Sequence, residues 1–310
     1  MSDILDKRLV FVTGKGGVGK TTVAAALGLV AARAGKRAIV CEVAQQERMS
    51  RVFEREGVGF SETRLATDLY AISIDPQRSM EEYLRHQIKP SQLYGVLFDN
   101  RLFQYFAAAT PGMRELATIG KVWELAQFER RNPHAAPYDV VIVDAPSTGH
   151  GLGFLRTPRT FRDAARVGAI SRQAGKIDSF ITDPDSTGVV AVALPEEMPV
   201  NETVDFERDL HAEMGIELDA VVVNALYPER FDDDEADRIE EAASANGSAG
   251  VEAALKAALF EHHRGRTQRA ELRRLSRELG HDPITLPFLF EPELDLDSFE
   301  ELADELEAAL

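Results

Sequence analysis

The sequence predicts an α/β protein in which a mostly parallel sheet is flanked by helices. Short and continuously apolar runs recur along the chain, as is typical of strands that are buried on both faces. Stretches with helical periodicity separate these runs, so right-handed crossovers between parallel strands are expected. A glycine-rich turn joins the first apolar run to the first helical stretch, a place where such sheets bind phosphate groups.

Apolar runs define the expected strands and leave longer intervals for helices. The runs cover residues 9–13, 38–43, 69–74, 140–143, 189–194, 220–223 and a short 284–288. The 310 residues are predicted to form a single domain, 1–310, around this sheet. A helical insertion is expected at about 76–136 and a shorter helical segment at about 156–180. Residues 93–109 of the insertion are apolar enough to bind a hydrophobic segment, although packing against the domain explains the same composition.

Charge and cysteine content exclude several classes of function. The formal net charge is −17, which disfavours nonspecific binding to nucleic acids because the phosphate backbone is repelled. The chain has one cysteine, Cys41, so a disulfide framework or a four-cysteine metal site within the chain is ruled out. No signal peptide pattern is visible and no apolar run approaches the roughly 20 residues that span a bilayer, so a cytoplasmic protein is expected.

Residues 14–21, GKGGVGKT, match the phosphate-binding pattern G-x-x-x-x-G-K-[ST] between a strand and a helix. Glycines let backbone N–H groups surround phosphate oxygens, and the helix N-terminus adds partial positive charge. Lys20 can reach the β- and γ-phosphates, and Thr21 can bind Mg²⁺. The sequence therefore predicts a magnesium-nucleotide site. Its nucleotide-binding residues are Gly14, Gly16, Gly17, Val18, Gly19, Lys20, Thr21 and Thr22.

A dinucleotide site is the alternative for the same loop. Gly14, Gly16 and Gly19 also fit G-x-G-x-x-G, and Glu42 ends the second expected strand, where such folds place an acid for the ribose. This alternative gives Lys20 and Thr21 no role, so the nucleoside triphosphate is preferred.

Asp144 directly follows the apolar run 140–143. An acidic residue in this position holds Mg²⁺, directly or through water, in phosphate-loop enzymes. Three glycines follow, Gly149, Gly151 and Gly153, and they predict a mobile loop that responds to the γ-phosphate. Asp144 and Thr21 are therefore the candidate metal ligands.

Lys15, immediately after the first glycine, is not required by an ordinary phosphate loop. With it, GKGGVGKT resembles the deviant Walker A motif of the SIMIBI-class P-loop ATPases. In those families the lysine reaches across a dimer interface to the partner's nucleotide. The resemblance therefore implies a P-loop NTPase fold, a homodimer and a catalytic role for Lys15 beside Lys20 and Asp144.

Residues 144–155, DAPSTGHGLGFL, narrow the resemblance. They are similar to the switch II segment of the ArsA family, which contains arsenite-pump ATPases and ATPases that target tail-anchored proteins. Residues 194–203 and 111–116 also resemble segments of that family. The resemblance implies that ATP is the nucleotide and that Asn224, after the run 220–223, recognises adenine.

The sequence departs from the family at switch I. The family has an aspartate there that positions the attacking water, whereas this chain has no aspartate in the corresponding CEVAQQE segment. Glu42 is the first candidate for this catalytic role, with Glu47, Gln45 and Gln46 as alternatives. Arsenite is disfavoured as a ligand because several thiolates hold it and Cys41 stands alone.

The resulting hypothesis is a homodimeric ArsA-family ATPase that binds and hydrolyses Mg-ATP. Its nucleotide state would be coupled to an unidentified protein or membrane-protein partner. One alternative is a slow switch in which ATP occupancy recruits a partner, motivated by the altered switch I. A DNA-positioning ATPase is a further alternative and would need a basic surface, for which residues 264–274 are the candidate.

Overall fold

A computed structural model describes residues 4–43, 48–53, 57–87, 110–165, 167–244 and 248–310. Within them, eight strands form one sheet in the order β3-β4-β2-β5-β1-β6-β7-β8. The strands are β1 (Leu9–Gly14), β2 (Ala38–Glu42), β3 (Thr63–Ala66), β4 (Leu69–Ser73), β5 (Val140–Ser147), β6 (Thr187–Ala193), β7 (Ala220–Leu226) and β8 (Ile284–Pro287). All neighbouring pairs are parallel except β3 and β4. The expected α/β class is therefore confirmed.

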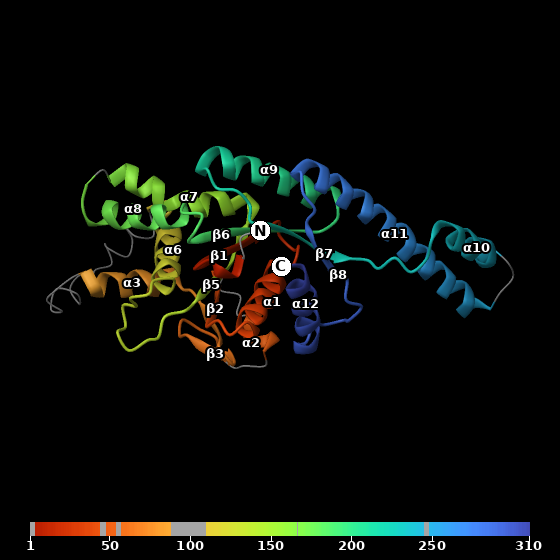
Figure 1. Ribbon diagram of the computed structural model, residues 1–310, viewed down its shortest axis with the longest axis horizontal. Coiled ribbons are helices and arrows are strands. Elements are labelled where there is room, and N and C mark those ends of the chain that lie inside the picture. Colours follow the sequence, from red (N-terminus) through yellow and green to blue (C-terminus); the bar gives the residue numbers. More distant parts are fainter. Residues whose placement is uncertain (1–3, 44–47, 54–56, 88–109, 166, 245–247) are drawn as a thin grey trace.

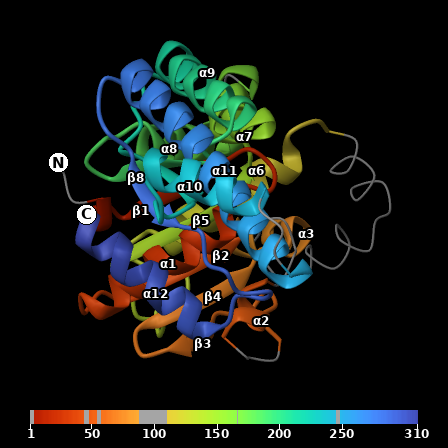
Figure 2. The same ribbon diagram turned by 90° about the vertical axis from the view of Figure 1, so that its right-hand side faces the viewer.

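Helices cover both faces of this sheet (Figures 1 and 2). The helices are α1 (Lys20–Arg33), α2 (Arg48–Val52), α3 (Pro76–Gln87), α6 (Met113–Leu125), α7 (Thr148–Ala165), α8 (Ala169–Ile181), α9 (Glu197–Met214), α10 (Asp233–Ser244), α11 (Ala249–Leu279) and α12 (Leu296–Ala309). Side chains of α1 and α12 form one core with the sheet, and those of α6, α7, α8 and α9 form a second. A smaller third core joins α9 and α11 to β6 and β7. The α10–α11 hairpin extends from one end of the molecule (Figure 1).

The predicted helical insertion contains α3 and α6 in its described part. The apolar stretch 93–109 lies outside the described residues. Its neighbour α6 packs on the sheet through Ile119, Val122 and Leu125, which are fully buried. Helix α6 therefore lies along one face of the sheet, with its C-terminal end at Arg8, just before β1.

Switch II differs from the sequence-based expectation of a mobile glycine loop. Helix α7 begins at Thr148, so Gly149, Gly151 and Gly153 are helical. Gly151 has a packing reason for lacking a side chain, because a Cβ there would lie 2.8 Å from Thr13 Oγ1. The glycine lets α7 approach β1 closely, and for these residues the expectation of a loop was wrong.

A network of buried charges ties α3 and α6 to the rest of the fold. Lys121 Nζ lies 2.9 Å from Glu82 and 3.0 Å from Glu124. Arg130 contacts Glu124 at 3.1 Å and Glu62 at 2.7 Å. Burial by itself raises the pKa of the Glu124 carboxyl, but Lys121 and Arg130 outweigh it and hold that pKa below its usual range. With Arg131, which lies 4.0 Å from Glu82, three cations face three carboxylates, and these charges depend on one another.

Candidate nucleotide site

The phosphate loop joins β1 to α1, and its glycines are required by close contacts. Gly14 has φ +151°, and a Cβ there would lie 2.1 Å from the carbonyl oxygen of Val192 on β6. Gly19 has φ +96°, and its Cβ would lie 2.2 Å from the Asn224 amide nitrogen. An added methyl group at either position meets backbone or a held side chain, as well as an unfavourable backbone conformation. The loop thus has the open backbone that a phosphate cradle needs.

The remaining predicted loop residues divide between exposed and buried positions. Gly16 and Gly17 are exposed at the tip of the loop, and Gly17 has a positive φ of 87°. Val18 is buried and anchors the loop, while Thr22 lies in the first turn of α1. This arrangement leaves the tip accessible to a ligand and fixes its base.

Thr21 and Asp144 meet as the sequence predicts. Thr21 Oγ1 donates a hydrogen bond of 2.6 Å to Asp144 Oδ2. They come together because β1 and β5 are parallel neighbours, with Val12 in register with Asp144, so both strands end at the same edge. A hydroxyl beside a carboxylate is the hard oxygen donor set that Mg²⁺ prefers. These residues fit the metal ion that a bound nucleotide would carry.

The two lysines of the loop have different surroundings. Lys20 Nζ donates to the carbonyl oxygen of Lys15 at 3.0 Å, at the start of α1. Lys15 instead forms an ion pair with Glu202 on α9. The same glutamate accepts a 3.2 Å hydrogen bond from Thr148 Oγ1, at the start of α7. Glu202 was missed as a site residue, although it falls in the family-like segment 194–203.

Asn224 lies on β7 against the phosphate loop. Its Nδ2 donates to the carbonyl oxygen of Val18 at 3.0 Å. The side chain is thus next to the nucleotide site, as its predicted role requires, and it also holds the loop. Recognition of adenine by Asn224 stays a prediction.

Glu42 ends β2 in register with Asp144, yet its side chain turns toward another element. It is 2% exposed, and Oε1 accepts a 3.1 Å hydrogen bond from the backbone N–H of Met49 in α2. This contact satisfies a backbone donor in the first turn of α2. The proposed role of Glu42 in positioning water stays a prediction. The alternatives Gln45, Gln46 and Glu47 lie outside the described residues.

Cys41 lies on β2 with its side chain in the core. Burial and the nearby Glu62 carboxylate raise the pKa of this thiol. A thiol kept protonated is a poor ligand for soft metals and metalloids, because the thiolate is the binding form. Within the described ranges, no group of three or more histidine, cysteine, aspartate or glutamate residues is arranged to hold a metal ion.

The basic segment 264–274 lies on α11, where acidic partners surround it. Arg264 pairs with Glu196 at 3.0 Å and Arg266 with Asp233 at 3.1 Å. Arg274 pairs with Glu271 of the same helix at 2.7 Å. Much of the positive charge is therefore compensated locally, which disfavours a phosphate-binding surface there.

In the part of the chain that the structure describes, none of the helices has the length and apolarity to span a membrane.

Comparison with known proteins is consistent with this site. The sequence matches the family described as anion-transporting ATPase over residues 7–173 and 163–247. It is 29% identical to ATPase BagA of Mycobacterium tuberculosis, covering 96% of this chain and 92% of that protein. An ATPase named get3 of Pyrenophora tritici-repentis is 28% identical over 73% of this chain and 76% of its own length.

A relative of greater length is also similar. A protein of Halobacterium salinarum named as an arsenical pump-driving ATPase is 31% identical over 74% of this chain, which spans 37% of that longer protein. The family match covers well over half of the chain, in the same segment that holds the phosphate loop, Asp144 and Asn224. The chain therefore belongs to the anion-transporting ATPase family and is an ATP-hydrolysing enzyme.

Proposed function

We propose that this ATPase works as a homodimer that binds Mg-ATP between its subunits and couples the nucleotide state to a protein or membrane-protein partner. The observation that carries the proposal is the pairing of Thr21 with Asp144 in a loop that also presents Lys20 and Lys15. Lys20 supplies the positive charge that the phosphates need from their own chain. Lys15 supplies a second charged amine to the same loop, and a site formed by a single chain does not require this second amine.

In the proposed site, each residue has a defined task. The loop backbone and the N-terminus of α1 bind the phosphates, and Lys20 neutralises charge on the β- and γ-phosphates. Thr21 and Asp144 would hold Mg²⁺, which when bound adds charge neutralisation across the same phosphates. Lys15 would reach the partner's nucleotide and stabilise the charge that develops in the transition state.

Switch II provides a path from the phosphates to the helices. Thr13 Oγ1, on β1 just before the phosphate loop, donates to the carbonyl oxygen of Pro146 at 3.0 Å, so the strand that leads into the loop is linked to β5. Helix α7 follows at once and packs through Phe154 and Leu155 into the core shared with α6 and α8. A shift of Pro146 on ATP binding would therefore move helices that lie away from the nucleotide.

Lys15→Ala tests the shared site. Wild-type protein is expected to convert from monomer to dimer when Mg-ATP is added, as measured by light scattering after size exclusion. The variant is expected to retain ATP binding, lose the dimer, and hydrolyse ATP on the order of 100-fold more slowly, because the charge supplied in trans is gone. Lys256→Ala, on the exposed face of α11, is the matched control. Wild-type turnover in Lys15→Ala would reject the proposal.

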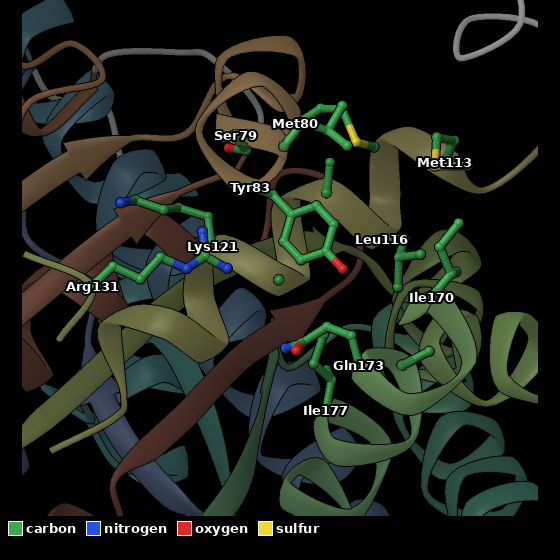
Figure 3. A pocket seen from close by; sticks show the side chains of 14 residues that line it. Ser79, Met80, Tyr83, Met113, Leu116, Lys121, Arg131, Ile170, Gln173 and Ile177 are labelled. Carbon is green, nitrogen blue, oxygen red and sulfur yellow. The ribbon is translucent and has the colours of Figure 1, made fainter. Parts of the chain in front are cut away.

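A slow ATP-occupancy switch that recruits an apolar partner is the second candidate, and a cavity favours it. A space of about 150 Å³ lies between α3, α6 and α8. Apolar side chains provide most of its surface, and five polar side chains also line it: Ser79, Tyr83, Lys121, Arg131 and Gln173 (Figure 3). A dry cavity of similar size can hold one benzene molecule. The cavity is therefore large enough for one apolar side chain of a partner.

Ala117→Leu tests this candidate because the larger side chain would fill the cavity that Ala117 lines. A synthetic leucine-rich peptide of about 20 residues, long enough to mimic a membrane segment, serves as the probe. The peptide is expected to change steady-state ATP turnover of the wild-type protein and to have no effect on the variant. The basal turnover of both proteins should agree. If the peptide changes the ATP turnover of the wild type and of Ala117→Leu equally, the cavity is excluded as the site at which the peptide acts.

A further inference from the structure

Glu202 connects the two segments that sense phosphate. It lies in α9, and its two carboxylate oxygens have different partners. Oε1 pairs with the Lys15 amine, and Oε2 accepts the 3.2 Å hydrogen bond from Thr148. One side chain thus contacts the second residue of the phosphate loop and the first residue of α7. The sequence-based assignment gave Glu202 no role.

The ion pair between Lys15 and Glu202 is weak enough to break and form again. The Lys15 side chain is 32% exposed and that of Glu202 36% exposed, so water screens the pair. A partly exposed ion pair changes an equilibrium by roughly 1.4- to fivefold. Such a pair holds Lys15 in the absence of a better anion, and a nucleotide with several negative charges can displace it.

We propose that Glu202 is a positioning residue that holds Lys15 in its own subunit until ATP-driven dimer closure releases it. This inference rests on the proposed function, in which Lys15 acts on the partner's nucleotide. Lys15 exchanges Glu202 for the phosphates across the interface when the two subunits close. We call the ion pair between Lys15 and Glu202 the clasp. The clasp limits dimer closure in the absence of ATP and gives the Lys15 side chain a defined starting position.

The second contact of Glu202 links this exchange to switch II. Thr148 begins α7, and the Pro146 carbonyl two residues earlier accepts the hydrogen bond from Thr13. When the carboxylate loses Lys15, it is free to shift, and its bond to Thr148 changes with it. Lys15 release and movement of the start of α7 are therefore coupled through one side chain.

Chemical labelling of Lys15 tests the clasp without any need for a dimer. Nucleotide-free protein is treated with a limiting amine acetylating reagent, and the modification of Lys15 is followed by mass spectrometry. In Glu202→Gln and Glu202→Ala, labelling of Lys15 is expected to be up to about fivefold faster, because the paired carboxylate is gone. High salt should raise the wild-type rate and narrow the difference, since it screens the pair.

Glu213→Gln is the matched control, because Glu213 pairs with Arg156 on the exposed face of the same helix, away from the loop. It should leave Lys15 labelling at the wild-type rate. Equal labelling of Lys15 in wild type and in both Glu202 variants would overturn the clasp, whatever the oligomeric state of the protein.

Dimer formation tests the consequence of the clasp. Because two clasps open per dimer, Glu202→Gln is expected to strengthen the dimer in Mg-ATP by between about twofold and thirtyfold. Sedimentation over a protein dilution series measures this. A weaker or unchanged dimer in Glu202→Gln, with a Lys15-dependent dimer in wild type, would overturn the clasp and leave the proposed function standing. Absence of any ATP-dependent wild-type dimer would overturn both.

Discussion

Lys20→Ala is expected to abolish ATP hydrolysis, with a loss of about 1,000-fold or more in turnover. Lys20 stands at the first position of α1, and its amine lies over the loop at the carbonyl of Lys15. In the proposed site, its removal would leave the charge of the β- and γ-phosphates without a compensating amine from the same chain. The measurement is release of inorganic phosphate at saturating Mg-ATP.

A matched control separates this effect from a general loss of charge. Lys36→Ala removes an amine beyond the other end of α1, where Lys36 pairs with Asp6. Its turnover should equal that of the wild type. Circular dichroism should show the same helical content in all three proteins. Turnover of Lys20→Ala within tenfold of wild type would exclude residues 14–21 as the catalytic phosphate loop.

Arg130→Ala is expected to lower the free energy of unfolding by about 3–5 kcal/mol, the cost of removing one partner from a buried ion pair. The Arg130 and Glu124 side chains are only 2% and 3% exposed. The variant leaves Glu124 with Lys121, while Glu62 loses its guanidinium partner. Urea denaturation at neutral pH measures the loss.

The neighbouring arginine provides the control for this variant. Arg131 lies 4.0 Å from Glu82 and is more exposed, so Arg131→Ala should cost less than about 1 kcal/mol. Equal losses for Arg130→Ala and Arg131→Ala would contradict the assignment of the buried network to Arg130.

The effect of Arg130→Ala is expected to depend on pH. Burial raises the pKa of Glu124 and Glu62, but their cationic and hydrogen-bonding partners lower it further, so both folded pKa values lie below the usual range. A carboxylate with a lowered folded pKa stabilises the protein above its unfolded pKa of about 4.3, and this stabilisation is lost as the pH falls through the folded value. The difference between wild type and variant should therefore be largest at neutral pH and shrink below about pH 4.

The sequence predicted which residues come together at the end of β1, because the determinants of this arrangement are local. The pattern of residues 14–21 fixes the loop chemistry, and the rule that parallel strands end at one edge brings Thr21 to Asp144. The buried strands were recognisable from their apolar runs. Strand β3 was missed, because its four residues alternate weakly and lie antiparallel at the edge of the sheet.

The features that the sequence did not predict depend on tertiary contacts. The glycines after Asp144 suggest a loop when only local propensity is considered, whereas the packing of Gly151 against Thr13 favours a helix that approaches β1. Glu202 is nearly two hundred residues away from Lys15 in sequence, so no local pattern could pair them. The contact of Asn224 with the phosphate loop is likewise visible only when β7 is placed beside it.

The burial of Cys41 makes the protein a convenient background for site-specific probes. It is the one cysteine in the chain, its side chain is fully enclosed, and burial raises its thiol pKa. Maleimide dyes react with accessible thiolates, so the unmodified protein should give little background labelling. A single cysteine placed on the exposed side of α9 would then carry one fluorophore per subunit. Energy transfer between two subunits labelled in this way would test the proposed dimer, with every residue of the proposed nucleotide site unchanged.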